Sequence, residues 1–311
     1  MKNALKIFLL IIFFSPAISQ AQDWTPDKLD RRRALPNDNK PPEKLFPDYN
    51  LQPRPNEGII RRVNIPSGER IVALTFDMCE LATITTGCDM DTINFLRENK
   101  IPATLFMGGK WMRTHSRRVK QLMNEQELFE IANHNWSHGN CALLSDRRLS
   151  QEILWTQAQY ELLRQEADPT LEHTPPVPAL FRLPYGRSSE KALKMISSLG
   201  LRVIQWDVAA ESGDNTKTKN AKRLAQKIAN MTRPGSIILF HANLVPKGTA
   251  NLLRFYVQEL QDRGYTFMKV SDLLEMGTPE TVREGYFTTP GDNLKLDGQF
   301  GFEGTGIKKR Q

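Results

Sequence analysis

Residues 70–80, Arg-Ile-Val-Ala-Leu-Thr-Phe-Asp-Met-Cys-Glu, decide the fold of this chain. They begin as a continuous apolar run with β-branched members, which is the pattern of a strand buried on both faces. The run ends abruptly in two carboxylates, Asp77 and Glu80, with the thiol of Cys79 between them. Because parallel sheets present their chemistry at the carboxyl ends of the strands, this stretch predicts a reactive site at the tip of a buried strand.

Strand-like and helix-like runs alternate from Arg70 onward. The predicted strands are 71–76, 102–107, 128–132, 179–183, 202–206, 236–240 and 266–269. The predicted helices are 90–99, 116–124, 146–166, 189–199, 218–230, 248–262 and 270–275. Strict alternation implies parallel strands with right-handed crossovers, and about seven units fit a barrel better than an open sheet. We therefore expect an α/β protein built as a distorted (β/α) barrel of about seven parallel strands.

The chain begins with the pattern of a secretory signal peptide. Lys2 and Lys6 flank the start of the apolar run 7–14, and small residues stand at positions 19 and 21, where a signal peptidase reads the chain. We expect cleavage after Ala21. A membrane anchor is the alternative, but the run is far shorter than the roughly 20 residues that span a bilayer.

The chain then divides into four predicted parts. Residues 1–21 are the signal peptide, and residues 22–67 are polar and proline-rich, which predicts a linker or an arm over the domain. Residues 68–275 carry the alternation and form the predicted catalytic domain. Residues 276–311 lose the alternation, so we expect a polar, partly ordered C-terminal tail.

The charge balance does not suggest nucleic-acid binding. There are 42 Lys and Arg against 35 Asp and Glu, a formal charge of +7 that falls to +5 once Lys2 and Lys6 are removed with the signal peptide. This mild basicity suits an anionic surface such as a cell wall, and no basic stripe or aromatic platform accompanies it. We expect a periplasmic or secreted protein with no stable membrane anchor after cleavage.

Three cysteines, Cys79, Cys88 and Cys141, occur in this chain. Thiols of exported proteins tend to oxidise, and an odd count leaves one of them unpaired. A Cys79–Cys88 bridge would close a short loop beside the predicted site. The sequence leaves that pairing open, because it does not give the distance between the sulfur atoms.

The sharpest local signal is a pair of histidines four residues apart, His134 and His138, which follows the apolar run 128–132. Imidazole nitrogen is the commonest protein ligand for zinc and similar ions. Two imidazoles with a carboxylate from Asp77 or Glu80 and an open position would make a catalytic metal site rather than a structural one. Solvated or hydrogen-bonded histidines are the alternative for a His-x-x-x-His pattern taken alone.

Three more predicted strands end in residues with chemical potential. Arg182 could hold a carboxylate with two hydrogen bonds, and the turn at 184–186 could aim a backbone N–H at an oxyanion. His241 could titrate near neutral pH as a general acid, and Trp206 ends another strand. Each has an ordinary alternative, namely a salt-bridged arginine, a buried histidine and a core tryptophan. Their shared position at one rim favours a common site.

In this order and spacing, the motifs resemble those of the polysaccharide deacetylases of carbohydrate esterase family four, which include chitooligosaccharide and peptidoglycan deacetylases. The resemblance covers about residues 68–275. Singly the motifs are loose, but as an ordered set they are specific. The matching residues are Thr75-Phe-Asp77, His134-x-x-x-His138, Arg182-x-Pro184-Tyr185, Trp206 and Leu239-x-His241.

The resemblance implies metal-dependent removal of acetyl groups from N-acetylated sugars by a distorted (β/α) barrel. Asp77 would be the general base, Arg182 would position it, and His241 would protonate the departing amine. His134 and His138 would hold a divalent metal ion, for which zinc is the expected identity. The resemblance also implies three substrate contacts: the Tyr185 backbone N–H would face the oxyanion, and Leu239 and Trp206 would line the pocket for the acetyl methyl group.

The chain departs from the family pattern at three places. The family usually carries a metal-binding Asp directly after the base, and Met78 stands there in this chain. Glu80 is the first substitute, and the further candidates are Asp89, Asp91 and the Cys79 thiolate. Asn135 follows the first histidine where Ser or Thr is common. Near Trp206 the usual acidic residue is replaced by Ala209 and Ala210, with Glu211 and Asp214 displaced. The pattern is that of a divergent branch.

The sequence thus predicts a metal-dependent N-deacetylase acting on an N-acetylated cell-envelope or extracellular glycan. Two alternatives remain open. A broken ligand set at Met78 would leave a non-catalytic glycan-binding barrel. The same scaffold could also hydrolyse a small non-sugar amide.

Overall fold

The computed structural model describes residues 24–25, 32–33, 40–45, 52–167, 179–211 and 220–299. The predicted signal peptide over residues 1–21 lies outside the described residues. No helix within these described ranges is long and apolar enough to cross a membrane.

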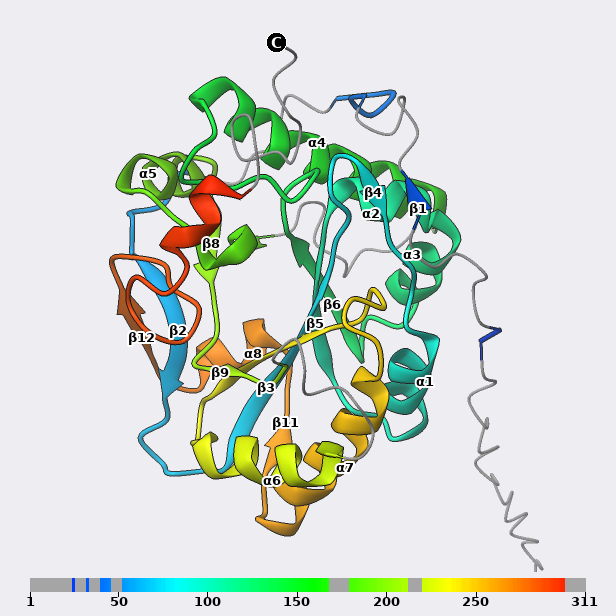
Figure 1. The fold of residues 1–311 in the computed structure, drawn as a ribbon, viewed down its shortest axis with the longest axis vertical. Helices are drawn as coiled ribbons and strands as arrows, with labels where there is room; N and C mark the ends of the chain where they lie inside the picture. Colours follow the sequence, from blue (N-terminus) through cyan, green and yellow to red (C-terminus); the bar gives the residue numbers. More distant parts are fainter. Residues whose placement is uncertain are drawn as a thin grey trace, which may run out of the picture.

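A curled, mostly parallel sheet forms the centre of the molecule (Figure 1). Within the described residues it has ten strands in the order β12-β2-β8-β7-β6-β5-β3-β10-β9, and β11 pairs with β3 outside this path. Its two sides meet at an isolated antiparallel bridge between Arg62 and Ser236. The strands are β2 (Ile59–Asn64), β3 (Ile71–Met78), β5 (Ala103–Met107), β6 (Phe129–Asn133), β7 (Leu180–Phe181), β8 (Arg202–Ile204), β9 (Val208–Ala209), β10 (Ile237–His241), β11 (Thr266–Phe267) and β12 (Thr278–Val282).

Helices surround the sheet (Figure 1). They are α1 (Met90–Glu98), α2 (Gly109–Thr114), α3 (Ser116–Met123), α4 (Asp146–Ala167), α5 (Glu190–Ser198), α6 (Ala221–Met231), α7 (Thr249–Asp262) and α8 (Val270–Glu275). Two short 3₁₀ turns, η2 (Pro184–Gly186) and η4 (Leu294–Gly298), follow β7 and β12. A separate pair of short strands, β1 (Arg32–Arg33) and β4 (Ile84–Thr85), lies beside the sheet.

Strand β3 is buried along its whole length, as the apolar run predicts. Its side chains alternate between two cores because successive residues of a strand point to opposite faces. Leu74, Phe76 and Met78 pack in the outer core beneath the helices. Ala73 packs in a second core inside the curled sheet, to which α8 contributes Val270, Leu273 and Leu274. Residue 77 falls on this inner face, so its carboxylate points toward the barrel interior.

The predicted (β/α) architecture is confirmed, and each of the seven predicted strands and seven predicted helices has a counterpart. The predicted domain boundaries are wrong at two places. Strand β2 lies inside the segment 22–67 that was predicted as an arm, and β12 lies inside the predicted tail 276–311. The two pair with each other antiparallel, and β2 also pairs with β8. The sheet therefore includes strands from both predicted flanking segments.

Candidate active site

A buried ion pair joins the ends of β7 and β3 across the barrel. Nη1 of Arg182 donates to Oδ1 of Asp77 and to Oγ1 of Thr75, at 2.8 Å each. The carbonyl oxygens of Ile204 and Gln205 accept from the other two guanidinium nitrogens at 3.3 Å. The guanidinium is therefore fixed on several sides, and it in turn fixes the Asp77 carboxylate.

Burial governs the electrostatics of this pair. The Arg182 side chain is fully buried and that of Asp77 is 6% exposed. Burial lowers the pKa of Arg182 from its usual value, and the charge of Asp77 opposes that effect. Removing one partner of such a buried pair leaves the other charge uncompensated, which typically costs about 3–5 kcal/mol.

The loop after β6 carries the histidine pair. His134 and His138 lie edge to face with ring centroids 4.8 Å apart. The loop between them is held by Glu152 of α4, whose carboxylate accepts from the backbone N–H and the hydroxyl of Ser137 at 2.7 and 2.6 Å. His138 has a φ of +57°, a left-handed conformation that costs on the order of 1 kcal/mol. The surrounding contacts are what hold the loop in this shape.

Asn135, the residue directly after His134, suits the backbone conformation at its position. Asn135 also has a positive φ, +63°, which asparagine tolerates better than Ser or Thr. Its backbone N–H donates to Oδ1 of Asn133 at 2.9 Å, and its side-chain amide donates to the carbonyl of Gly139 at 3.1 Å. The departure from the family pattern at this position therefore supports the turn.

The hydrogen bonds of His134 define its free nitrogen. Its Nδ1 lies 2.9 Å from the carbonyl oxygen of Arg182, so Nδ1 carries the proton and Nε2 keeps its lone pair. Nε2 of His134 is buried without a hydrogen-bond partner, and it lies 3.4 Å from Oδ2 of Asp77. Nδ1 of His138 is also buried without a hydrogen-bond partner. Burial lowers the pKa of both imidazoles, most strongly that of His138. Both rings are neutral at neutral pH, which is the state that binds a metal ion.

The third group beside the imidazoles is the Cys79 thiol. Ligand atoms of Cys79, His134 and His138 all lie within 4.8 Å of one another, and this is the only such group of three or more found in the described part of the chain. The backbone carbonyl of Cys79 accepts from the Thr86 hydroxyl and from the Asn243 amide, at 2.9 Å each. These contacts hold the thiol beside the histidines.

The structure does not bring Glu80 to the imidazoles, so the predicted first substitute for the missing ligand is corrected. The carboxylate of Glu80 accepts from the backbone N–H of Thr86 at 3.1 Å and from the hydroxyl of Thr114 at 3.0 Å. Met78 packs in the outer core. Asp89 caps α1 by accepting from the backbone N–H of Thr92. Of the four substitutes considered, only Cys79 lies with the histidines.

The donor set suits a divalent ion of the zinc type. Imidazole and thiolate are the ligands that zinc prefers, and three protein ligands leave a fourth position open for catalysis. Burial, together with the charges of Asp77 and Glu80, raises the pKa of Cys79 well above its ordinary value. Because a coordinated thiol loses its proton outright, a bound cation would reverse that effect. None of the three cysteines takes part in a disulfide, so a Cys79–Cys88 bridge is not formed.

His241 ends β10 directly beside Asp77, its partner in the register of β10 and β3. Its Nδ1 and its backbone N–H both lie within 2.9 Å of Oε2 of Glu211. Burial alone would lower the pKa of His241, but the hydrogen bond and charge of Glu211 outweigh it, so this pKa lies above its ordinary value. The imidazole is 26% exposed, so a substrate could reach it.

The three predicted substrate residues lie near this centre. Tyr185, in the turn η2, has its ring 4.3 Å from that of His138 in an edge-to-face contact. The Arg182 guanidinium lies 5.4 Å from the Trp206 ring centroid. Leu239 is buried on β10 two residues before His241, on the same face of the strand. All the predicted site residues except Glu80 therefore gather around one mouth of the barrel.

Sequence reasoning missed the contribution of the C-terminal segment. The Trp206 indole Nε1 donates to the carbonyl of Phe287 at 2.9 Å, and the two rings are 5.0 Å apart. The aromatic pair Tyr286-Phe287 within a polar stretch was the available signal. Glu211 was noted only as a displaced acid, yet it is the partner of His241.

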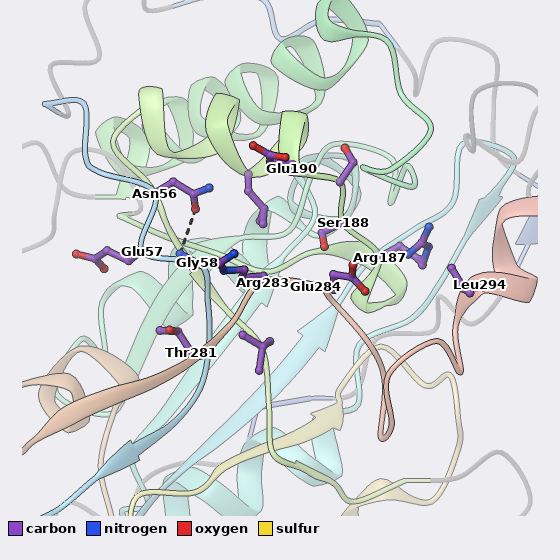
Figure 2. Close-up of a pocket in the computed structure, with 13 residues that line it drawn as sticks. Asn56, Glu57, Gly58, Arg187, Ser188, Glu190, Thr281, Arg283, Glu284 and Leu294 are labelled. Carbon is purple, nitrogen blue, oxygen red and sulfur yellow. Dashed lines mark hydrogen bonds between the residues drawn. The ribbon is translucent and has the colours of Figure 1, made fainter.

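A separate pocket of about 770 Å³ lies beside the segment that follows η2 (Figure 2). Residues of the turn after β7, of α5, of β12 and of the stretch before β2 line it, including Asn56, Arg187, Glu190 and Arg283. None of the predicted site residues does so. The pocket is therefore distinct from the candidate active site.

Part of the chain is similar to known proteins. Residues 64–204 match the family model described as polysaccharide deacetylase. A peptidoglycan-N-acetylglucosamine deacetylase of Bacillus cereus is 28% identical over 211 residues, covering 68% of this chain and 91% of the relative. A chitooligosaccharide deacetylase of Azorhizobium caulinodans is 28% identical over 216 residues, covering 65% of this chain and 93% of the relative.

Solved structures share the fold. A peptidoglycan N-acetylglucosamine deacetylase superposes with a TM-score of 0.55 at 23% identity, covering 71% of this chain and 92% of that chain. A wild-type protein from Bacillus anthracis, described as a pseudoenzyme of carbohydrate esterase family four, superposes with a TM-score of 0.53 at 20% identity, covering 70% and 69%. Both similarities concern the fold alone.

Proposed function

Because this chain carries a polysaccharide deacetylase domain, we propose that it is a metal-dependent hydrolase that removes acetyl groups from an N-acetylated cell-envelope or extracellular glycan. The observation that carries the proposal is the convergence of four strand ends. Three groups of side chains lie at the tips of β3, β6, β7 and β10. They are the Asp77–Arg182 ion pair, the His134–His138 pair with Cys79, and the His241–Glu211 pair.

Asp77 is the proposed general base. Oδ1 is engaged by Arg182, while Oδ2 lies toward His134 and the ligand group, where it can take a proton from the attacking water. The ionised carboxylate is the form that accepts a proton. The contacts of Arg182 with Ile204 and Gln205 keep that carboxylate in one orientation.

Cys79, His134 and His138 would hold the metal ion, for which zinc is the proposed identity. When bound, such an ion would supply polarisation of the amide carbonyl and a lowered pKa of water, which is the chemistry that amide hydrolysis requires. Tyr185 lies at the turn beside His138, and we assign to its backbone N–H the contact with the oxyanion. Leu239 and Trp206 form the proposed apolar pocket for the acetyl methyl group.

His241 is the proposed general acid. It stands beside Asp77 in the register of neighbouring strands, so one group accepts a proton and the other donates one within the same mouth. Glu211 keeps His241 protonated toward higher pH, which is the state that can protonate the departing amine. The proton acceptor Asp77 therefore lies beside a positive charge, that of Arg182. The proton donor His241 lies beside a negative charge, that of Glu211.

The glycan substrate and the location of the protein are part of the proposal. Relatives named for peptidoglycan and chitooligosaccharides support an N-acetylated glycan. The signal-peptide pattern over residues 1–21 supports export to the periplasm or beyond. The mild positive charge suits an anionic cell-wall polymer.

Release of acetate tests the function. Mature protein purified with zinc should release acetate from N-acetylglucosamine oligomers or peptidoglycan, and a chelator should abolish that release until zinc is restored. The control is the chelated protein supplied with magnesium, an oxygen-preferring ion that suits this donor set poorly. Absence of acetate from every glycan tested, with a stoichiometric ion bound, would contradict the proposal.

A non-catalytic glycan-binding protein is the second candidate function. Met78 in place of the usual metal-binding Asp favours it, as does the fold shared with a family pseudoenzyme. Metal analysis separates the two functions. Glycan binding by a protein that holds less than one ion per chain would favour the binding protein.

Glu211→Gln should shift the alkaline limb of the rate profile to lower pH. The variant keeps a hydrogen-bond acceptor for His241 but removes the charge that raises its pKa. Since the acid form of His241 exists only below that pKa, kcat should begin to fall at a lower pH while the rate at acidic pH is retained. The measurement is kcat against pH.

Glu190→Gln, at an exposed position, is the matched control and should leave the alkaline limb in place. An unmoved limb in Glu211→Gln would exclude the role of Glu211 in keeping His241 protonated.

A further inference from the structure

The segment that follows β12 packs against the turn after β7 and a residue that follows β8. Residues 284–298, here called the C-terminal strap, lie outside the region 64–204 that matches the family model. The strap includes η4, which in Figure 1 lies near the connection between β7 and α5. It contacts both the turn that carries Tyr185 and the Trp206 side chain.

Backbone packs directly on backbone where the strap meets this turn. Gly186 has a φ of +64°, and a Cβ there would lie 3.1 Å from the carbonyl oxygen of Tyr286. A Cβ on Gly285 would lie 2.1 Å from the carbonyl oxygen of Gly186. The backbone N–H of Gly285 also donates to the hydroxyl of Ser188 at 2.9 Å. Gly285 thus allows an approach that a side chain would block, and Gly186 adopts a left-handed φ that other residues rarely adopt.

Asn293 joins the strap to Tyr185 itself. It is 1% exposed, and its side-chain amide donates to the carbonyl of Tyr185 at 3.1 Å and to that of Gly285 at 3.4 Å. Tyr185 has a φ of +59°, a left-handed conformation that is uncommon for an aromatic residue. A donor fixed against its carbonyl holds this conformation, which sets the direction of the Tyr185 N–H.

Further contacts keep the strap rigid. The carboxylate of Asp297 pairs with the Arg187 guanidinium at 2.9 and 2.7 Å and accepts from the Asn140 amide at 2.9 Å. The carboxylate of Asp292 accepts from the backbone N–H groups of residues 287, 288 and 289. Arg61 of β2 donates to the carbonyls of residues 286 and 287 at 2.8 and 3.0 Å. The strap is therefore anchored to β2, to the turn after β7 and to the loop that follows His138.

We propose that the C-terminal strap is a positioning element of the active site, in which Asn293 holds Tyr185 in the conformation that aims its backbone N–H at the oxyanion. This inference rests on the proposed deacetylase function. Asn293 acts through Tyr185 and is a positioning residue. Phe287 does the same for Trp206, through the hydrogen bond to the indole and the contact of the two rings.

Asn293→Asp tests the proposal with little change of volume. It removes the amide donor and puts carboxylate oxygens against two carbonyls. We expect kcat to fall about tenfold or more, with KM changed less than about twofold. Complete loss of an oxyanion donor lowers kcat by about 10²–10³-fold, and misplacement of the donor should lower it less. Leu294→Ala, at the exposed neighbouring position, is the matched control and should keep both constants.

Amide hydrogen exchange supplies a readout that does not depend on activity. Exchange in peptides spanning residues 183–188 should rise in Asn293→Asp, while peptides from β3 and β5 should exchange as in the wild type. Unchanged exchange in the turn, or raised exchange with an unchanged kcat in an active enzyme, would overturn the proposal. A wild type that releases no acetate but whose turn loosens in the variant would refute the proposed function and leave the strap's hold on Tyr185 standing.

Discussion

Asp77→Asn is expected to lower kcat for deacetylation by roughly 10²–10⁴-fold, the usual loss when a general base is removed. The amide is nearly the size of the carboxylate, and its oxygen can still accept from Arg182, whose Nη1 lies 2.8 Å from Oδ1 of Asp77. The substitution therefore removes the proton acceptor while keeping the shape of the site. The measurement is kcat and KM from acetate release with saturating zinc.

The variant also removes the charge that compensates Arg182. Loss of a buried partner of this kind typically costs about 3–5 kcal/mol, so thermal unfolding must show that the protein remains folded at the assay temperature. Asp207→Asn is the matched control, because Asp207 accepts from Ser236 and Ile237 at the opposite end of β10 from His241. A folded Asp77→Asn enzyme with a rate within threefold of the wild type would exclude Asp77 as the base.

Cys79→Ser is expected to weaken metal binding by at least about 100-fold. Changing residues around the ligands of a metal site commonly costs 10–100-fold in affinity, so loss of a ligand should cost no less. In the cobalt-substituted protein, thiolate ligation gives a near-ultraviolet charge-transfer band, which should be present in the wild type and absent from the variant. Titration with a competing chelator measures the affinity, and this readout needs no catalysis.

Two variants separate Cys79 from the other candidate ligands. Cys88→Ser should keep both the charge-transfer band and the affinity, because the Cys88 thiol lies against the sulfur of Met90 rather than the histidines. Glu80→Gln should keep the band as well, since its carboxylate is engaged by Thr86 and Thr114. A cobalt protein without the band, and with affinity lost in Glu80→Gln instead, would restore Glu80 as the third ligand.

Much of the architecture was predictable because the apolar patterns of the central strands and helices indicate their secondary structure. Strand β3 is buried on both faces, so its residues are uniformly apolar until the site begins. β2 and β12 were missed for the opposite reason. β12 is an edge strand, Thr-Pro-Glu-Thr-Val, with no fully buried residue. Three of the six residues of β2 are polar, and its apolar residues lie within a proline-rich stretch.

The candidate site was predictable where one residue at a strand end determines the chemistry. Asp77, His134, Arg182 and His241 each follow or close an apolar run, and parallel strands bring such residues together. The third ligand was not predictable, because Glu80 and Cys79 are neighbours in the sequence and only the backbone direction after β3 decides which one faces the imidazoles. Asn293 gives no local signal, since its role depends on a contact with a turn 108 residues away.

The pairing of β2 with β12 has a consequence for the order of events during folding. Arg62 of β2 and Glu280 of β12 are hydrogen-bonded although 218 positions separate them. Contacts of such long range form slowly, because a large loop must close before they contribute. Until β12 has been synthesised, β2 lacks its antiparallel neighbour. A nascent chain of this topology therefore keeps an incomplete sheet until β12 has emerged, however early β2 itself is made.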